Sequence, residues 1–175
     1  MFSVTEVFDI AIQLEENGER LYRMAADQVQ DESLRAMLAW LADEEVRHRA
    51  RFVEMKRSTK ILAAREQWAD EASGAVLQSV IGDHAFSLDD LDPVTLQNEA
   101  ALMRLAIEFE EDGILFYEMI RSFVSEPDAL LQLDAILNEE RQHVDLFKKS
   151  MALNLSLAKI KVASPASASY ADSGP

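Results

Sequence analysis

The sequence predicts an all-α protein: a bundle of four long helices with one long connection between the second and the third. Only five Gly and four Pro occur in 175 residues, which favours helices over strands. Apolar residues also recur at steps of three and four along four long segments, the spacing that places them on one face of a helix. A chain of this length can bury most of its apolar surface within one domain.

Capping signals set the expected limits of these helices. Ser3-Val4-Thr5-Glu6 has the pattern of a capping box. Asp92-Pro93 and Pro127 each place proline at the start of a helix, where its missing N–H leaves no intrahelical bond unmade. We therefore expect helices from 4 to about 29, from 34 to about 57, from 93 to about 124 and from 127 to about 162.

The second and third helices are joined by a long segment, 58–91, in which we expect one or two short helices. His84 lies there two residues after Gly82, and we interpret it as a loop or capping residue rather than a ligand. Residues 163–175 are small and Ser-rich, so we expect a disordered tail after a single domain at 1–162.

The composition argues against several classes of function. A formal net charge of −15 disfavours binding to nucleic acid or to an anionic membrane. The absence of cysteine excludes disulfides, iron–sulfur clusters and thiol catalysis. The N-terminal segment has the acidic residues that a signal peptide lacks, and the longest apolar run is too short to span a bilayer. We therefore expect a cytoplasmic protein.

One four-residue pattern occurs twice, as Glu45-Val46-Arg47-His48 and as Glu140-Arg141-Gln142-His143. Residues three apart share a helix face, so each pattern points one carboxylate and one imidazole in the same direction. A single Glu-x-x-His is weak evidence, because a surface ion pair has the same spacing. Here two of the three histidines carry it, and each pattern has another glutamate thirty residues before it, Glu15 and Glu110.

The two halves of the chain repeat one design. A shift of 95 residues superposes them without a gap, and two such helical hairpins would bring four Glu and two His together from four helices. The paired residues are Glu15 and Glu110, Gly18 and Gly113, Tyr22 and Tyr117, Glu45 and Glu140, and His48 and His143.

Such a set of side chains indicates a metal site. Four carboxylates buried at one level would repel one another, whereas two divalent cations would cancel their charges and accept the histidine nitrogens as further ligands. Oxygen and nitrogen donors without cysteine suit iron or manganese, and zinc can also occupy them. The alternative is a bundle in which core Glu and His only hydrogen-bond, but burying four Glu for structure alone would be costly.

At these residues the chain resembles the ferritin-like di-iron carboxylate superfamily, and within it the rubrerythrin-like proteins. The resemblance covers roughly residues 3–155 and implies a ferritin-like four-helix bundle whose second and third helices are parallel, so that their connection crosses over along the whole bundle. It also implies two iron ions, with Glu15 and Glu110 as terminal ligands, Glu45 and Glu140 as bridges, and His48 and His143 completing one iron each.

Other features refine this resemblance. Tyr22 and Tyr117 each follow a terminal Glu by seven residues and could hydrogen-bond a carboxylate on a neighbouring helix, although ordinary buried tyrosines are an equal alternative. Rubrerythrins often carry a four-cysteine rubredoxin module that delivers electrons, and this chain has none. Gly113 stands where rubrerythrins proper carry an extra carboxylate, so the site is expected to be more symmetric, closer to ferritin and bacterioferritin centres.

The resemblance implies an oxidoreductase that reduces hydrogen peroxide or O₂ with electrons from an external donor protein, in a role connected with oxidative stress. One alternative is Fe(II) oxidation with iron binding and storage, as in a ferroxidase. Another is a metal-independent helical interaction protein, which would be favoured if the buried glutamates bound no metal. We expect a homodimer or a larger homo-oligomer in either of the metal-binding cases.

Overall fold

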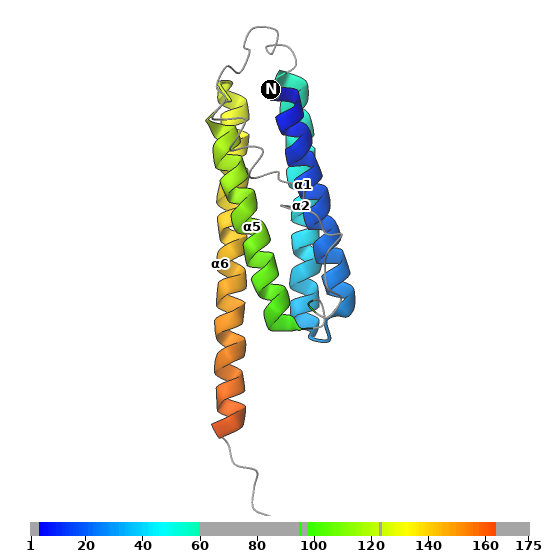
Figure 1. The fold of residues 1–175 in the computed structure, drawn as a ribbon, viewed down its shortest axis with the longest axis vertical. Helices are drawn as coiled ribbons and strands as arrows, with labels where there is room; N and C mark the ends of the chain where they lie inside the picture. Colours follow the sequence, from blue (N-terminus) through cyan, green and yellow to red (C-terminus); the bar gives the residue numbers. More distant parts are fainter. Residues whose placement is uncertain (1–3, 60–94, 96–97, 123, 164–175) are drawn as a thin grey trace, which may run out of the picture.

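The computed structural model describes residues 4–59, 95, 98–122 and 124–163. This described part of the chain contains four helices and no strand, which confirms the all-α class. None of its helices has the length and apolar character needed to cross a membrane. The helices, labelled as in Figure 1, are α1 (Val4–Gln28), α2 (Glu32–Thr59), α5 (Glu99–Arg121) and α6 (Pro127–Ala163).

The helices form two antiparallel hairpins that lie side by side (Figure 1). In the first hairpin α1 packs along α2, and in the second α5 packs along α6. The hairpins meet through contacts of α1 with α5 and of α2 with α6. Helix α2 ends and α5 begins at opposite ends of the bundle, so the two helices are parallel and their connection must cross its length (Figure 1). The expected crossover is therefore confirmed.

The predicted limits of three helices agree with the structure to within the usual one or two residues. The exception is the third helix: α5 begins at Glu99, so the expected continuous helix is interrupted at Asn98, while its expected start at Asp92-Pro93 lies outside the described residues. Asn98 has an extended backbone, with φ −102° and ψ 101°, and its side chain accepts a hydrogen bond of 3.0 Å from the N–H of Ala101. Asparagine is a strong N-cap because its short side chain satisfies one of the unpaired N–H groups at a helix start.

Several sequence expectations lie outside the described residues. They are the capping box at Ser3, the short helices expected within 58–91, the loop histidine His84 and the tail that follows Ala163. Helix α6 itself extends to Ala163 and continues beyond the other three helices at the lower end of the bundle (Figure 1).

The apolar core consists of two clusters, one toward each end of the bundle. One contains Phe8, Phe52 and Phe116 among others, and the second contains Leu21, Leu38 and Phe147. Each fully buried Leu or Phe stabilises the fold by about 1.5–3 kcal/mol through the removal of its surface from water. On every helix the two clusters are separated by buried polar residues, so the core is interrupted by one polar layer. That layer holds Glu15 on α1, Glu45 and His48 on α2, Glu110 on α5, and Glu140 and His143 on α6.

Candidate metal centre

The polar layer brings together all six side chains that the sequence singles out as ligands. None of them exposes more than 3% of its surface, and they project from all four helices. The helical spacing explains their meeting, because the Glu and the His of each Glu-x-x-His pattern lie on the same buried face. Unpaired charges are rarely buried to this extent, so the layer requires protons or cations for its stability.

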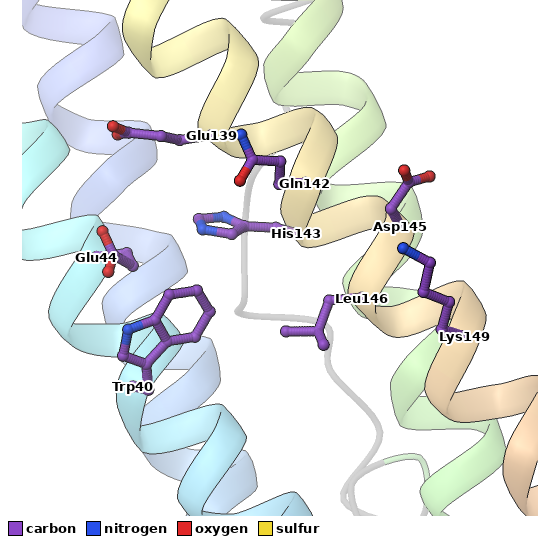
Figure 2. A pocket seen from close by; sticks show the side chains of 8 residues that line it. All are labelled: Trp40, Glu44, Glu139, Gln142, His143, Asp145, Leu146 and Lys149. Atoms are coloured by element: carbon purple, nitrogen blue, oxygen red, sulfur yellow. The ribbon is translucent and has the colours of Figure 1, made fainter.

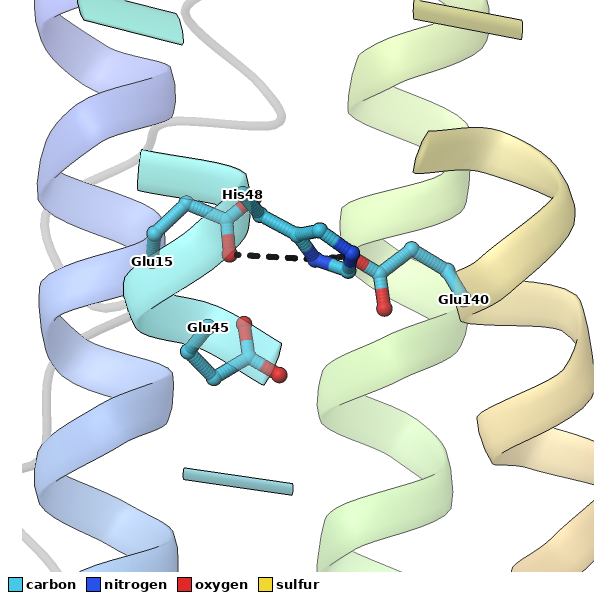
Figure 3. Close-up of side chains that lie close together, drawn as sticks. All are labelled: Glu15, Glu45, His48 and Glu140. Carbon is cyan, nitrogen blue, oxygen red and sulfur yellow. Dashed lines mark ion pairs between the residues drawn. The ribbon is translucent and has the colours of Figure 1, made fainter. Parts of the chain in front are cut away.

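The potential ligand atoms fall into two overlapping groups of four. Within each group, one nitrogen or oxygen atom per residue lies within 4.8 Å of every other. Glu45 and Glu140 belong to both groups, which places them where two ions could share them. The first group is Glu15, Glu45, His48 and Glu140 (Figure 3), and the second is Glu45, Glu110, Glu140 and His143.

Two buried atoms of this layer have no hydrogen-bond partner among the described residues, Oε1 of Glu45 and Nδ1 of His48. Nδ1 of His48 is 2.8 Å from Oε1 of Glu140 and 3.8 Å from Oε2 of Glu15 (Figure 3). The first separation is short enough for an ion pair, but the geometry is not that of a hydrogen bond. Leaving a buried polar atom without a partner costs about 1–3 kcal/mol, which a cation between these atoms would remove. The donor set therefore fits a metal ion.

Both imidazoles present Nδ1 to the carboxylates. Nδ1 of His143 lies 2.9 Å from Oε2 of Glu140 and 3.5 Å from Oε1 of Glu110. The His48 and His143 rings are stacked, with centroids 5.8 Å apart and planes inclined by 24°. Glu140 thus has an imidazole at each of its two oxygens, which suits a carboxylate shared by two ions.

The two tyrosines make the hydrogen bonds that the sequence suggests, and they make them across the hairpins. The Tyr22 hydroxyl donates to Oε1 of Glu110, and the Tyr117 hydroxyl donates to Oε1 of Glu15, both over 2.5 Å. Each tyrosine therefore fixes the terminal glutamate of the other half. These paired bonds are the clearest expression of the pseudo-twofold relation between the hairpins.

In the metal-free protein the layer neutralises part of its charge with protons. Burial raises the pKa of Glu15 and Glu45 and raises the pKa of Glu110 to about 8. Burial acts to lower the pKa of both histidines, but the neighbouring carboxylates outweigh it and raise the pKa of His48 to about 9 and that of His143 to about 10. Binding of a cation to these ligands would release the bound protons.

Glu140 behaves differently from the other three glutamates. Its burial acts to raise the pKa, but His143 and His48 stabilise the charged form and hold the pKa at about 2. The carboxylate between the two imidazoles is therefore ionised, while Glu110, with its pKa of about 8, holds a proton at neutral pH.

Just outside the layer lies an ion pair that the sequence did not predict. Oε2 of Glu139 accepts a hydrogen bond of 2.8 Å from Nε2 of His48, and Arg51 binds both oxygens of Glu139 at 2.7 and 3.3 Å. Glu44, His48 and Glu139 also form a third, partly buried group of potential ligands. The duplication offered one signal, because Glu139 is the counterpart of Glu44, but the counterpart of Arg51 is Leu146.

A pocket of about 480 Å³ lies against the layer on the side of His143 (Figure 2). The Trp40 ring meets the His143 ring edge-on, with centroids 5.4 Å apart, although Trp40 is 45% exposed. The sequence did not identify Trp40. The pocket is lined by Trp40 and Glu44 from α2 and by Glu139, Gln142, His143, Asp145, Leu146 and Lys149 from α6.

Gly18 makes room for one of the shared carboxylates. A Cβ atom at this position would lie 3.0 Å from Phe109 and 3.1 Å from the carboxyl group of Glu45. Its counterpart Gly113 has more space, since the nearest atom to such a Cβ would be a methyl carbon of Leu14 at 3.7 Å. Gly18 therefore needs to be a glycine, because a side chain there would press against Glu45, whereas Gly113 is under no such constraint.

Comparisons with known proteins agree with this geometry. The family model for rubrerythrin matches residues 6–151, a range that includes all six buried Glu and His residues. None of the curated proteins matches the sequence.

Two solved structures share the fold at low identity. A hypothetical protein from Pyrococcus furiosus is 22% identical, with a TM-score of 0.64 over 89% of this chain and 92% of that one. A protein from Thermotoga maritima, described as ferritin-like and diiron-carboxylate, is 21% identical, with a TM-score of 0.62 over 86% of this chain and 95% of that one. The predicted ferritin-like bundle is thus confirmed, and from the match of its family model the chain belongs to the rubrerythrin family.

Proposed function

We propose that this chain holds two iron ions in its polar layer and uses them to reduce hydrogen peroxide, or O₂, with electrons from an external donor protein. The observation that carries the proposal is the pair of overlapping ligand groups that share Glu45 and Glu140 and that contain two buried atoms without hydrogen-bond partners among the described residues. Oxygen and nitrogen donors of this kind suit iron or manganese, and zinc could occupy the same positions without redox activity.

In this proposal each ion has its own pair of ligands and shares the other two. Glu15 and His48 would hold one ion, Glu110 and His143 the other, and Glu45 and Glu140 both. Two adjacent iron ions would supply the two electrons that the cleavage of an O–O bond requires. The tyrosines would keep the terminal carboxylates in place, and the apolar clusters on both sides would exclude water.

The rest of the cycle requires other molecules. The chain has no cysteine and hence no iron–sulfur or rubredoxin-type electron carrier of its own, so the proposal includes a separate donor protein. The pocket beside His143 offers an approach for a small oxidant. A cytoplasmic homodimer or larger homo-oligomer that binds neither nucleic acid nor membrane completes the proposal.

A second candidate is the oxidation of Fe(II) as substrate, with iron storage or detoxification as the purpose. Gly113 favours it, because this position would carry the extra carboxylate of the rubrerythrins proper and here has no side chain. The near-symmetric set of ligands is the one that the resemblance to ferritin centres implies. A metal-independent interaction protein is disfavoured, because such a protein would have no use for buried unpartnered atoms of Glu45 and His48.

Rapid mixing distinguishes these candidates. Protein loaded anaerobically with Fe(II) is mixed with equimolar H₂O₂ or O₂ while the absorbance of Fe(III) is followed. We expect about two Fe(II) per chain and one oxidation that is faster with H₂O₂ and then stops for want of a donor. Much faster oxidation by O₂ would favour the ferroxidase, and no oxidation by either would leave a metal-binding bundle. Replacing His48 should abolish the fast phase, and replacing His84 should leave it unchanged.

A further inference from the structure

The two halves of the molecule carry the same ligands but hold their histidines differently. We propose that Glu139, which is bound by Arg51, is a positioning residue for His48. As a result, the metal position at Glu15 and His48 has a higher affinity than the position at Glu110 and His143. This inference rests on the proposed function, because it requires metal ions in the polar layer.

The His48 ring is held from its far side. Its Nε2–H donates to Oε2 of Glu139 over 2.8 Å, and the Arg51 guanidinium grips both oxygens of that carboxylate. When a cation displaces the second ring proton, the proton that stays on Nε2 leaves the lone pair on Nδ1, the buried atom that has no hydrogen-bond partner among the described residues. A carboxylate behind a ligating histidine fixes the tautomer and the ring orientation and makes the other nitrogen a stronger donor to a metal.

The His143 ring lacks this support in the described part of the chain. Both of its carboxylate contacts, with Glu110 and Glu140, are made by Nδ1. Glu44 stands at the duplicated position of Glu139, but its carboxylate is bound by Arg47 of its own helix at 3.0 Å. On its outer side His143 meets the edge of Trp40 and lines the pocket (Figure 2).

The reason for the difference is visible in the sequence. The residue that corresponds to Arg51 is Leu146, and the residue that corresponds to Arg47 is Gln142. The first half therefore supplies an arginine that reaches across to Glu139, whereas the second half has no cation at the matching position to reach Glu44. As a result one imidazole is fixed by an ion pair and fully buried, and the other is fixed by packing and borders a pocket.

Two consequences follow for metal binding. The Glu15/His48 position should fill first and release its ion last, because its histidine is already oriented. The Glu110/His143 position should bind more weakly and exchange through the pocket. Loss of a carboxylate behind a ligating histidine typically lowers metal affinity by about 10- to 100-fold, so the inequality should be measurable.

The test is a titration of the metal-free protein with Co²⁺, followed by the visible absorption of the bound ion and by calorimetry. We expect two binding steps separated by about tenfold or more in Kd. Glu139→Ala should weaken the tighter step by about 10- to 100-fold and leave the weaker step unchanged. Asp134→Ala, a matched control that removes an arginine-bound carboxylate outside the polar layer, should change neither step by more than about twofold.

A second readout distinguishes positioning from a general loss of structure. In Zn²⁺-loaded protein, ¹⁵N-detected spectra of the three histidines should show His48 protonated at Nε2, with that proton protected from exchange. Glu139→Ala should remove the protection, whereas Asp134→Ala should keep it. If Glu139→Ala does not fold, Glu139→Gln carries the test: it keeps an acceptor but no charge and should weaken the tighter step severalfold.

The outcomes separate this inference from the proposed function. Wild-type protein that binds no Co²⁺ would overturn both. Two equal binding sites, an unprotected His48 proton, an unchanged tighter step in Glu139→Gln, or equal losses in the Glu139 and Asp134 variants would overturn the inference alone. The two-metal site would remain in each of those cases.

Discussion

The α1–α2 hairpin and the α5–α6 hairpin present the same ligands from the same duplicated positions, yet their surroundings differ. In the first hairpin Gly18 is in contact with Glu45, and His48 is closed off by Glu139. In the second, Gly113 has space around it, and His143 borders a pocket. Helical spacing alone therefore explains which Glu and His side chains meet. The solvent access of each histidine, and the contacts that hold it in place, depend instead on the packing between helices.

The largest expected effect comes from the ligands that both positions share. Glu140→Ala removes a carboxylate of both groups together with the partner of both histidines, so we expect it to abolish the binding of two ions. Glu110→Ala touches only the second group and should leave about one ion per chain. Elemental analysis after loading with excess Zn²⁺ and desalting measures both. Equal metal content in the two variants would show that Glu140 is not shared.

The stability of the metal-free protein should fall as the pH rises. The folded pKa values of Glu110, His48 and His143 are about 8, 9 and 10, above the ordinary values of 4.5, 6.5 and 6.5 for these groups. The folded state therefore keeps protons that the unfolded state has lost. The stability that these groups contribute is fully present below their pKa values in the unfolded state, and it is lost as the pH rises through their pKa values in the folded state. Glu140 has the opposite sign, because its folded pKa of about 2 makes it stabilising above 4.5.

The free energy of unfolding of the metal-free protein should accordingly be greatest at about pH 4.5 and decrease toward pH 10. Bound Zn²⁺ should remove most of the decrease, since it binds the folded state. Urea unfolding from pH 4 to pH 9.5, with and without Zn²⁺, measures this. A flat profile for the metal-free protein would contradict this description of the layer.

The two glycines should respond in opposite directions to the same change. Gly18→Ala forces a Cβ against Phe109 and Glu45 and should destabilise the protein by about 1–3 kcal/mol, with weaker metal binding. Gly113→Ala meets only ordinary contacts and should stabilise its helix by about 0.5–1 kcal/mol, because Ala is the better helix former. Urea unfolding of the metal-free variants gives both values. Equal effects would mean that Glu45 moves aside freely.

The smallest expected effect is one in which the two halves agree. Tyr22→Phe and Tyr117→Phe each remove one hydrogen bond of 2.5 Å to a terminal glutamate. Each substitution should lower the free energy of unfolding by about 0.5–1.5 kcal/mol, and the two decreases should be nearly equal. The same unfolding measurement is sufficient. A large difference between the two would show that the pseudo-twofold relation does not extend to these bonds.

Much of this architecture could be predicted from the sequence, because it depends on spacing. The 3.6-residue period determines both the apolar faces and the direction of Glu45 and His48. The start of α5 after Asn98 was not predicted, because Asp92-Pro93 is also a good helix start by sequence and the apolar spacing does not show that a cap lies at Asn98. Arg51 was missed for a different reason: its pairing with Glu139 joins α2 to α6 and has no counterpart in the other half.

The role of Gly18 and the place of Trp40 also depend on packing. The duplication identifies Gly18, but the lack of space for a side chain there depends on how closely Phe109 of α5 and Glu45 of α2 approach it. Trp40 lies half-exposed on α2, and its contact with His143 follows from the arrangement of α2 beside α6. Neither distance is encoded in the spacing of residues along one helix.

The central claim is that the polar layer holds two ions that share Glu45 and Glu140. Anomalous diffraction at the iron edge, from crystals grown anaerobically with Fe(II), tests it most directly. The expected result is two peaks about 3.5–4 Å apart, both in contact with Glu45 and Glu140, one beside His48 and the other beside His143. A single peak, or peaks only outside the layer, would contradict it.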